Sequence, residues 1–139
     1  MSSHEVFVPG QPVAKARARV TMRGGKPRAY TPKKTADFEA LVQSHCRDLP
    51  LMHGPLKLSI VFWLQTPKSW SNKKKLQAEV DEILPTTRPD IDNYAKAVMD
   101  SLNGIAYEDD SQVVELTVRK RYSEQPGTSI IIQSSMPLN

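Results

Sequence analysis

The sequence predicts a single domain of the α+β class, with a mixed, largely antiparallel sheet of about four strands and helices packed on one face. Three observations support this fold. The chain has 139 residues, the length of one ordinary domain and enough to bury a core. Apolar and polar residues alternate in residues 56–65, which is the period of a strand. Apolar residues in 35–49 recur at three- and four-residue steps, which is the period of a helix.

The beginning of the chain predicts a short apolar strand at residues 5–8, followed by a basic arm at about residues 10–34. No acidic residue stands between Glu5 and Asp37. The basic residues in that interval are Lys15, Arg17, Arg19, Arg23, Lys26, Arg28, Lys33 and Lys34. Within residues 13–32, Gly24-Gly25 and two prolines favour an extended or flexible segment rather than a helix.

Two interpretations of this basic arm remain open. It is either a solvated loop, since charge runs usually face water, or an arm that binds phosphates. The lack of local carboxylates favours the second interpretation. Lys15, Arg17 and Arg19 alternate, so an extended chain would project all three from one side.

The middle of the chain predicts a helix, a strand and a second helix. Pro50 ends the helix of residues 35–49, and the strand of residues 56–65 follows. Ser71 is a suitable cap for the next helix. The apolar residues on one side of that helix are Leu76, Val80, Ile83 and Leu84. Lys73, Lys74 and Lys75 occupy its first turn, where the helix dipole disfavours cations; a solvated cluster and a contact to phosphates are equal alternatives.

An acidic segment follows at residues 88–116, "RPDIDNYAKAVMDSLNGIAYEDDSQVVEL". Pro89 disfavours helix at Arg88, so we expect an extended lead-in and a helix that begins near Asp92 or Asn93. Its predicted apolar stripe is Tyr94, Ala97, Val98 and Leu102. The opposite face presents Asp92, Lys96 and Asp100 at four-residue steps, and Asp90 can point the same way.

Asn103-Gly104 is a stop signal for this helix, and an acidic turn then enters a strand with Val114, Leu116 and Val118 on one side. We expect residues 129–133 to pair with that strand through a hairpin at residues 125–127. We also expect the strand to lie beside residues 56–64, so that Asp109-Asp110 approaches the acids of the helix.

Closely placed carboxylates repel one another unless a cation neutralises them. That cation is either Arg17, Arg19 or Lys96 in a structural ion-pair network, or a hard divalent metal with oxygen ligands. The pattern does not fit an EF-hand, because Tyr94 stands at the next ligand position and the required glycine is missing. One cysteine and three scattered histidines argue against zinc. No catalytic Ser-His-Asp group or dinucleotide fingerprint is recognisable.

Composition limits the cellular setting. The single cysteine, Cys46, cannot form an internal disulfide, and neither a signal peptide nor an apolar run of membrane-spanning length is recognisable. We therefore expect a cytoplasmic protein without a membrane partner. The net charge is +4, and the uneven placement of the basic residues is typical of proteins that bind nucleic acid.

The acidic segment resembles the signature of the RusA family of Holliday-junction resolvases. The shared features, in order, are Asp-x-Asp-Asn, a lysine four residues after the second aspartate, Asp-x-Leu-Asn-Gly and Asp-Asp-x-Gln-Val-Val. "VPGQPVAKARAR" and "PKSWSNKKK" resemble the basic opening and the lysine-rich loop of phage-type members more loosely. The resemblance implies a homodimeric, magnesium-dependent endonuclease, with Mn²⁺ as a substitute, that cuts four-way DNA junctions by paired symmetric nicks and is often encoded by a phage or prophage.

Roles follow from the resemblance position by position. Asp90, Asp92 and Asp110 would be the metal ligands, Asp109 could substitute for or support Asp110, and Lys96 would be the essential lysine. Asp100 would pair with Lys96 on the same face of the helix. Asn93 would either cap the helix or contact and orient the metal ligands. The expected DNA-binding residues are Lys15, Arg17, Arg19, Arg23, Lys26, Arg28, Lys73, Lys74 and Lys75. For the dimer surface the candidates are Trp63, Trp70 and Phe62, although core packing suits Phe62 better.

Two other functions compete with the junction resolvase. The same acids could serve a nuclease for other branched, flapped or single-stranded DNA. They could also be salt-bridge partners in a non-catalytic DNA-binding phage module, which would bind DNA with steep salt dependence and cut nothing.

Overall fold

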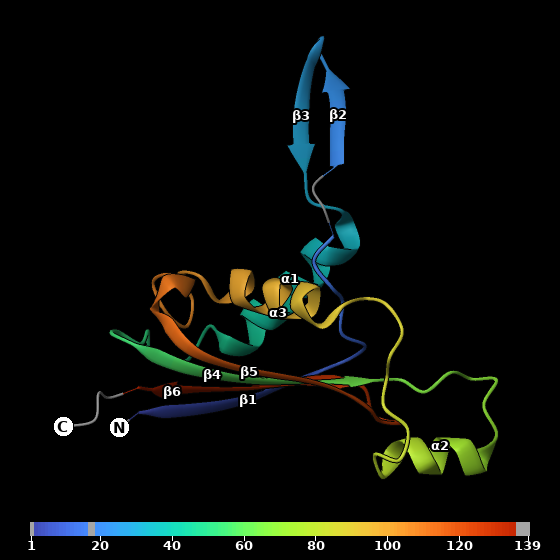
Figure 1. The fold of residues 1–139 in the computed structure, drawn as a ribbon. Helices are drawn as coiled ribbons and strands as arrows, with labels where there is room; N and C mark the ends of the chain where they lie inside the picture. Colours follow the sequence, from blue (N-terminus) through green and yellow to red (C-terminus); the bar gives the residue numbers. More distant parts are fainter. Residues whose placement is uncertain (1, 17–18, 136–139) are drawn as a thin grey trace.

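A computed structural model of the chain describes residues 2–16 and 19–135. The predicted fold class is confirmed: a single α+β domain is built on a four-stranded mixed sheet (Figure 1). The strand order is β1 (Ser3–Pro9), β6 (Gly127–Ser134), β4 (Leu56–Leu64) and β5 (Val113–Tyr122). Only the β4–β5 pair is parallel; β6 is antiparallel to both β1 and β4.

The sheet forms around β4, whose alternation matches the prediction. Every second residue from Leu56 to Leu64 is buried, while the intervening side chains are half-buried. The buried set packs with Ile130 and Ile132 of β6 into one core. Phe62 belongs to this core and is fully buried, so it is not available for a dimer surface.

Two helices cover one face of the sheet. Helices α1 (Lys33–Cys46) and α3 (Ile91–Leu102) lie together above it, whereas α2 (Asn72–Glu79) lies beyond one end (Figure 1). The predicted cap of α2 is confirmed, because the Ser71 hydroxyl accepts a hydrogen bond from the Lys74 amide at 3.2 Å. Within the described ranges no helix has both the length and the apolar character needed to cross a membrane.

The prediction that Leu76, Val80 and Leu84 form a buried apolar side of α2 is wrong. Leu76 and Val80 are 65% and 59% exposed, and Leu84 beyond the helix is also exposed; Ile83 packs partly against the core. The residue that anchors α2 is Ala78, which is fully buried. Ala78 is thus the buried residue of this short helix, Glu79 adds a hydrogen bond from the Glu124 amide at 3.1 Å, and Leu76 and Val80 stay in solvent.

The predicted hairpin between the last two strands is also wrong. β5 pairs with β4, and β6 lies on the other side of β4. The reason is visible in the burial of each strand. Most side chains at the beginning of β5 are exposed, which suits an edge strand, whereas β6 buries Ile130 and Ile132 and needs a partner on each side.

The basic arm contains a hairpin that the sequence analysis did not assign. β2 (Arg19–Arg23) pairs with β3 (Lys26–Tyr30), and the pair projects away from the sheet beyond α1 (Figure 1). Gly24 and Gly25 form the turn with φ of 58° and 76°, a conformation that glycine adopts without steric cost. Arg17, a predicted DNA-binding residue, lies outside the described residues, so the one-sided projection of Lys15, Arg17 and Arg19 stays a prediction.

Lys15 ties the arm to the two covering helices. Its Nζ lies 3.0 Å from a Glu39 carboxylate oxygen on α1 and 3.4 Å from an Asp100 oxygen on α3. Burial alone would lower the pKa of Lys15, but the hydrogen bond and charge of Glu39, followed by Asp100, raise it overall. The side chain is only 23% exposed, so this network has a structural role.

We therefore expect Lys15→Met to lower the free energy of unfolding by about 1 kcal/mol at neutral pH. Because the folded-state pKa is raised, the contribution is fully present below the unfolded pKa and is lost as pH rises through the folded value. Urea unfolding at pH 7 and at alkaline pH measures this. Lys33→Met is the matched control, because Lys33 pairs with Asp37 on the exposed side of α1. Equal stability of wild type and Lys15→Met at pH 7 would contradict the assigned role.

Candidate active site

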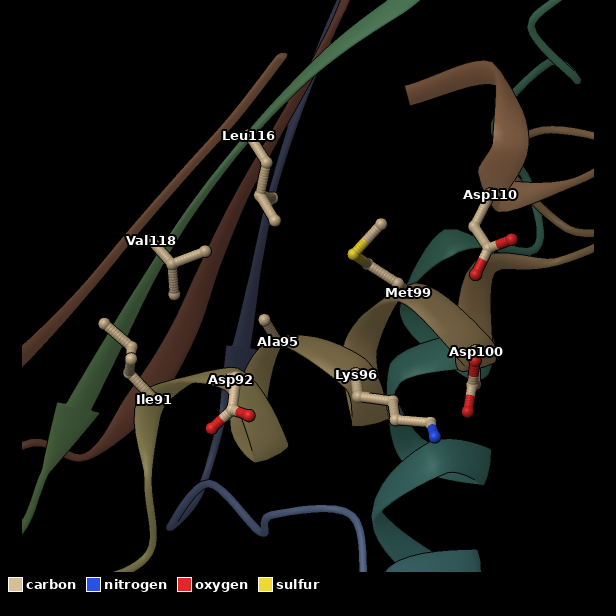
Figure 2. Close-up of a pocket in the computed structure, with 9 residues that line it drawn as sticks. All are labelled: Ile91, Asp92, Ala95, Lys96, Met99, Asp100, Asp110, Leu116 and Val118. Carbon is tan, nitrogen blue, oxygen red and sulfur yellow. The ribbon is translucent and has the colours of Figure 1, made fainter. Parts of the chain in front are cut away.

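A cavity of about 480 Å³ lies between α3 and β5 and collects most of the predicted catalytic side chains (Figure 2). Its floor is apolar, and its polar rim holds three aspartates and one lysine. The lining residues are Ile91, Asp92, Ala95, Lys96, Met99, Asp100, Asp110, Leu116 and Val118. Asp92 lies in α3 and Asp110 in the turn after it, and the fold brings both to this cavity.

Helix α3 orients its polar face by burying the opposite one. Tyr94, Ala97, Val98 and Leu102 are buried as predicted, and the Tyr94 ring lies 5.1 Å from that of Phe62 on β4. Burying this stripe leaves Asp92 and Lys96 exposed at the cavity. The helix begins earlier than predicted, since Asp90 and not Asp92 or Asn93 occupies the N-cap position. The predicted stop is confirmed: the helix ends at Leu102, and Gly104 has φ of 74°.

The loop after α3 is held so that Asp110 reaches the cavity. The Tyr107 hydroxyl donates a hydrogen bond to the Met99 carbonyl at 2.8 Å, which fastens the loop to α3. Burial raises the pKa of Tyr107, and the charges of Asp110, Asp100 and Asp109 raise it further, so the hydroxyl keeps its proton. Sequence reasoning did not identify Tyr107, because its role depends on a contact that only the folded loop creates.

Gln112 explains the glutamine of the Asp-Asp-x-Gln motif. Its side-chain oxygen accepts hydrogen bonds from the Glu108 and Asp109 amides at 2.8 and 3.1 Å. Its side-chain nitrogen donates to the Met52 and Gly54 carbonyls at 3.2 and 3.0 Å. One amide side chain therefore joins the acidic turn to the segment before β4, which only a group with both donors and acceptors can do.

The two neighbouring aspartates of this turn differ in their surroundings. Asp109 caps the short 3-10 helix of residues Asp110–Gln112, where its carboxylate accepts a hydrogen bond from the Ser111 amide at 3.0 Å. That bond lowers the pKa of Asp109. Asp110 lines the cavity, and Asp109 does not. The geometry thus favours Asp110 as the functional acid and a local structural role for Asp109.

Asp90 lies beside a second cavity of about 580 Å³, next to the first. Ile91 and Val118 line both cavities, so the two adjoin at the start of α3. The second cavity is bordered by three consecutive basic residues of β5, Arg119, Lys120 and Arg121. Sequence reasoning missed them as candidate phosphate contacts, although the Arg-Lys-Arg run directly after the acidic segment was a visible signal.

Lys120 holds the lead-in to the acidic helix. Its Nζ donates to the Thr87 carbonyl at 3.0 Å and to the Pro89 carbonyl at 3.1 Å, which secures the residues directly before Asp90. Arg119 is exposed, and among the described residues its side chain has no hydrogen-bond or ion-pair partner. Lys120 therefore positions the lead-in to α3, whereas its neighbour Arg119 contributes only a positive charge.

If Asp90 is a metal ligand of the nuclease that the sequence predicts, we expect Lys120→Met to lower the turnover rate of DNA cleavage by about tenfold, because residues that orient a metal ligand typically matter at that level. Affinity for linear duplex DNA should change little. Arg119→Met is the control: it removes a neighbouring charge and should weaken DNA binding without lowering the rate at saturating DNA. Rates at saturating DNA and dissociation constants measure the two effects. Identical behaviour of the two variants would contradict a positioning role for Lys120.

The predicted ion pair between Lys96 and Asp100 is not formed. Asp100 pairs with Lys15 instead, and in the described part of the chain Lys96 has no ion-pair or hydrogen-bond partner. Figure 2 shows the Lys96 side chain running along the rim of the cavity between Asp92 and Asp100. Lys15 outcompetes Lys96 for Asp100 because it reaches Glu39 at the same time. This leaves the Lys96 ammonium free to contact an anionic ligand.

The chemistry of the rim fits a hard divalent cation, since all its acidic donors are carboxylate oxygens. Within residues 2–16 and 19–135, however, no three acidic, histidine or cysteine side chains are gathered into a metal-ligating group. Asp92 and Asp110 share the cavity, and Asp90 lies outside it. The donor types thus match the predicted magnesium site, whereas the side chains are spread around two adjoining cavities.

The remaining basic residues lie at separate places. Lys26 is in β3, and the backbone of Arg19, Arg23 and Arg28 belongs to the same hairpin. Lys73, Lys74 and Lys75 are on α2; the Lys74 ammonium lies 4.2 Å from the centre of the Trp70 ring, which in turn packs edge-on against Tyr122. Trp63 donates a hydrogen bond to Ser129 at 3.0 Å and is half-buried. A role for these residues in DNA binding or in dimerisation stays a prediction.

One comparison with known proteins identifies a family, and a second finds a relative of similar length. The sequence model of the family described as "Endodeoxyribonuclease RusA" matches residues 9–133. The chain is also 44% identical over 129 residues to the "Uncharacterized protein YqaN" of Bacillus subtilis (strain 168), and the match covers 89% of this chain and 91% of the relative. The matched region includes both cavities and the basic hairpin.

Proposed function

This chain belongs to the RusA endodeoxyribonuclease family, and on that premise we propose that it is a magnesium-dependent endonuclease that resolves four-way DNA junctions. The observation that supports this proposal best is the shared cavity of Asp92, Lys96 and Asp110. Besides Asp100, which pairs with Lys15, it presents two carboxylates and a free ammonium over an apolar floor, beside a row of basic side chains. An acidic site next to cations suits a polyanionic substrate that is cut with the help of a metal.

Each residue has a distinct part in this proposal. Asp92 and Asp110 would hold Mg²⁺, or Mn²⁺ as a substitute, and Asp90 would contribute from the adjoining cavity. When bound there, the cation would supply charge neutralisation at the phosphate and would make a water easier to deprotonate. Lys96 contacts the phosphate that bears the developing negative charge, because its ammonium has no competing partner among the described residues. Arg119 and the basic hairpin bind neighbouring phosphates.

We further propose that the active form is a homodimer. A four-way junction is nearly two-fold symmetric, and cutting opposite strands needs two active sites related by that symmetry. Each protomer of 139 residues would contribute the acidic cavity of Asp92 and Asp110 to one of these two sites. Paired symmetric nicks would then follow from the two-fold axis of the protein.

A panel of DNA substrates of equal sequence tests this function. It comprises a four-way junction, a three-way junction, a flap, linear duplex and single strands, each labelled in turn on every strand and incubated with Mg²⁺. We expect cleavage of the four-way junction at symmetric positions in opposite strands, with little cutting of linear duplex. Preferential cutting of flaps or single strands would favour a different nuclease, and binding without any cutting would favour a non-catalytic DNA-binding module.

A further inference from the structure

The β2–β3 hairpin has two chemically different sets of positions. Its register places Val20 opposite Ala29 and Met22 opposite Pro27, so one set is entirely apolar. The other set pairs Arg19 with Tyr30, Thr21 with Arg28 and Arg23 with Lys26, and is mostly cationic. Because residues on one face of a two-stranded ribbon alternate, the register predicts an amphipathic hairpin.

Two large side chains of the apolar set, Val20 and Met22, are exposed. Val20 is 68% and Met22 is 66% exposed, the two largest values among the large apolar side chains of the described residues. Figure 1 shows the hairpin projecting beyond α1 and away from the sheet, and neither Val20 nor Met22 belongs to the core. Two adjacent exposed apolar side chains at the end of a projecting element are typical of a surface that meets a partner.

The base of the hairpin is fixed beside the acidic helix. The buried Thr35 hydroxyl donates to the Ala14 carbonyl and accepts from the Ala16 amide, both at 3.4 Å, and so joins the two ends of the arm. The Lys15 amide donates to the Asn93 carbonyl in the first turn of α3 at 2.8 Å. The foot of the arm is therefore fixed beside the first turn of the helix that bears Asp92 and Lys96, and the hairpin projects from that point.

We propose that the hairpin inserts at the branch point of the DNA, with Val20 and Met22 packed against exposed base faces and the cationic positions on the flanking phosphates. This inference rests on the proposed function. The charge of the arm selects DNA as the occupant, because eight basic and no acidic residues stand between Glu5 and Asp37. Apolar side chains gain contact with bases where stacking is already interrupted, as at a branch point, and gain little along an intact duplex.

Binding measured in EDTA tests the inference separately from catalysis. The junction contains 2-aminopurine next to the branch point, and the control is a linear duplex with the same base in the same sequence. The double variant Val20→Thr/Met22→Gln introduces residues that are compatible with a strand, so the hairpin should still form, but it removes the apolar contact. Wild-type protein should raise the 2-aminopurine fluorescence of the junction, because insertion unstacks the base. We expect the double variant to lose most of this rise. Its ratio of duplex to junction dissociation constants should fall by about fivefold or more, in line with the value of base stacking contacts.

Lys26→Gln is the matched control on the cationic set. It should weaken junction and duplex binding equally and lower the salt slope of binding by about 1 unit. If Val20→Thr/Met22→Gln keeps the fluorescence rise and the preference, or weakens duplex binding equally, the inference is overturned. If Val20→Thr/Met22→Gln is a monomer in solution while the wild type is a dimer, the hairpin serves a contact between protein copies, and the inference is also overturned. A wild type without junction preference would overturn the proposed substrate and, with it, this inference.

Discussion

Asp92→Asn is expected to reduce the rate of junction cleavage by about 10²–10³-fold while the protein stays folded and keeps its affinity for the junction. Asp92 is exposed at the cavity, and the buried stripe of α3 does not depend on it, so removing its charge should not disturb the helix. Single-turnover cleavage with saturating protein and Mg²⁺ measures the rate, and binding in EDTA measures the affinity.

Asp48→Asn is the control for the change of charge. Asp48 is exposed in the segment after α1 and lines neither cavity, and its removal raises the net charge from +4 to +5 just as Asp92→Asn does. Both variants should bind DNA slightly more tightly at low salt, but only Asp92→Asn should lose cleavage. Cleavage by Asp92→Asn at more than about one-tenth of the wild-type rate would contradict a catalytic role for this carboxylate.

The adjacent pair Asp109 and Asp110 offers a second test with a large expected effect. Asp110→Asn should reduce cleavage by about 10²-fold or more, because it removes a carboxylate from the cavity rim. Asp109→Asn should retain most of the activity, because asparagine also caps a helix and can accept the hydrogen bond from the Ser111 amide. Single-turnover rates of the two variants, measured side by side, give the comparison.

The charge change and the position in the turn are nearly the same in both variants, so each serves as the control for the other. Titration of Mg²⁺ adds a second readout, since Asp110→Asn should also shift the midpoint of activation to higher Mg²⁺. The opposite order, with Asp109→Asn inactive and Asp110→Asn active, would show that the functional acid of the turn had been assigned to the wrong residue.

The sequence predicted those parts of the site that depend on local periodicity. The four-residue spacing of Asp92 and Lys96 against the apolar stripe of α3 was sufficient to place both on the exposed face. The alternation in β4 predicted a strand buried on one face, and the acidic turn was expected beside it. A helix or strand period is a property of neighbouring residues, so it is readable without knowing the rest of the fold.

Contacts between distant segments could not be predicted in the same way. Lys15 competes successfully for Asp100 because α1 brings Glu39 to the same place, and no spacing in the sequence indicates that meeting. Lys120 holds Thr87 and Pro89 for a similar reason. The order of the last strands was mispredicted because a short connection favours a hairpin, whereas the burial of β6 requires a central position.

The dependence of junction cleavage on Mg²⁺ tests the central claim most directly. Wild-type protein is incubated with a labelled four-way junction in Mg²⁺, in Mn²⁺ and in EDTA, with Asp92→Asn as the control for contaminating nucleases. We predict symmetric nicks in Mg²⁺ or Mn²⁺, none in EDTA, and only the residual cleavage expected above with Asp92→Asn. Equal cleavage in EDTA, or junction binding with no cleavage in either metal, would contradict the assignment of the cavity as a metal-dependent nuclease site.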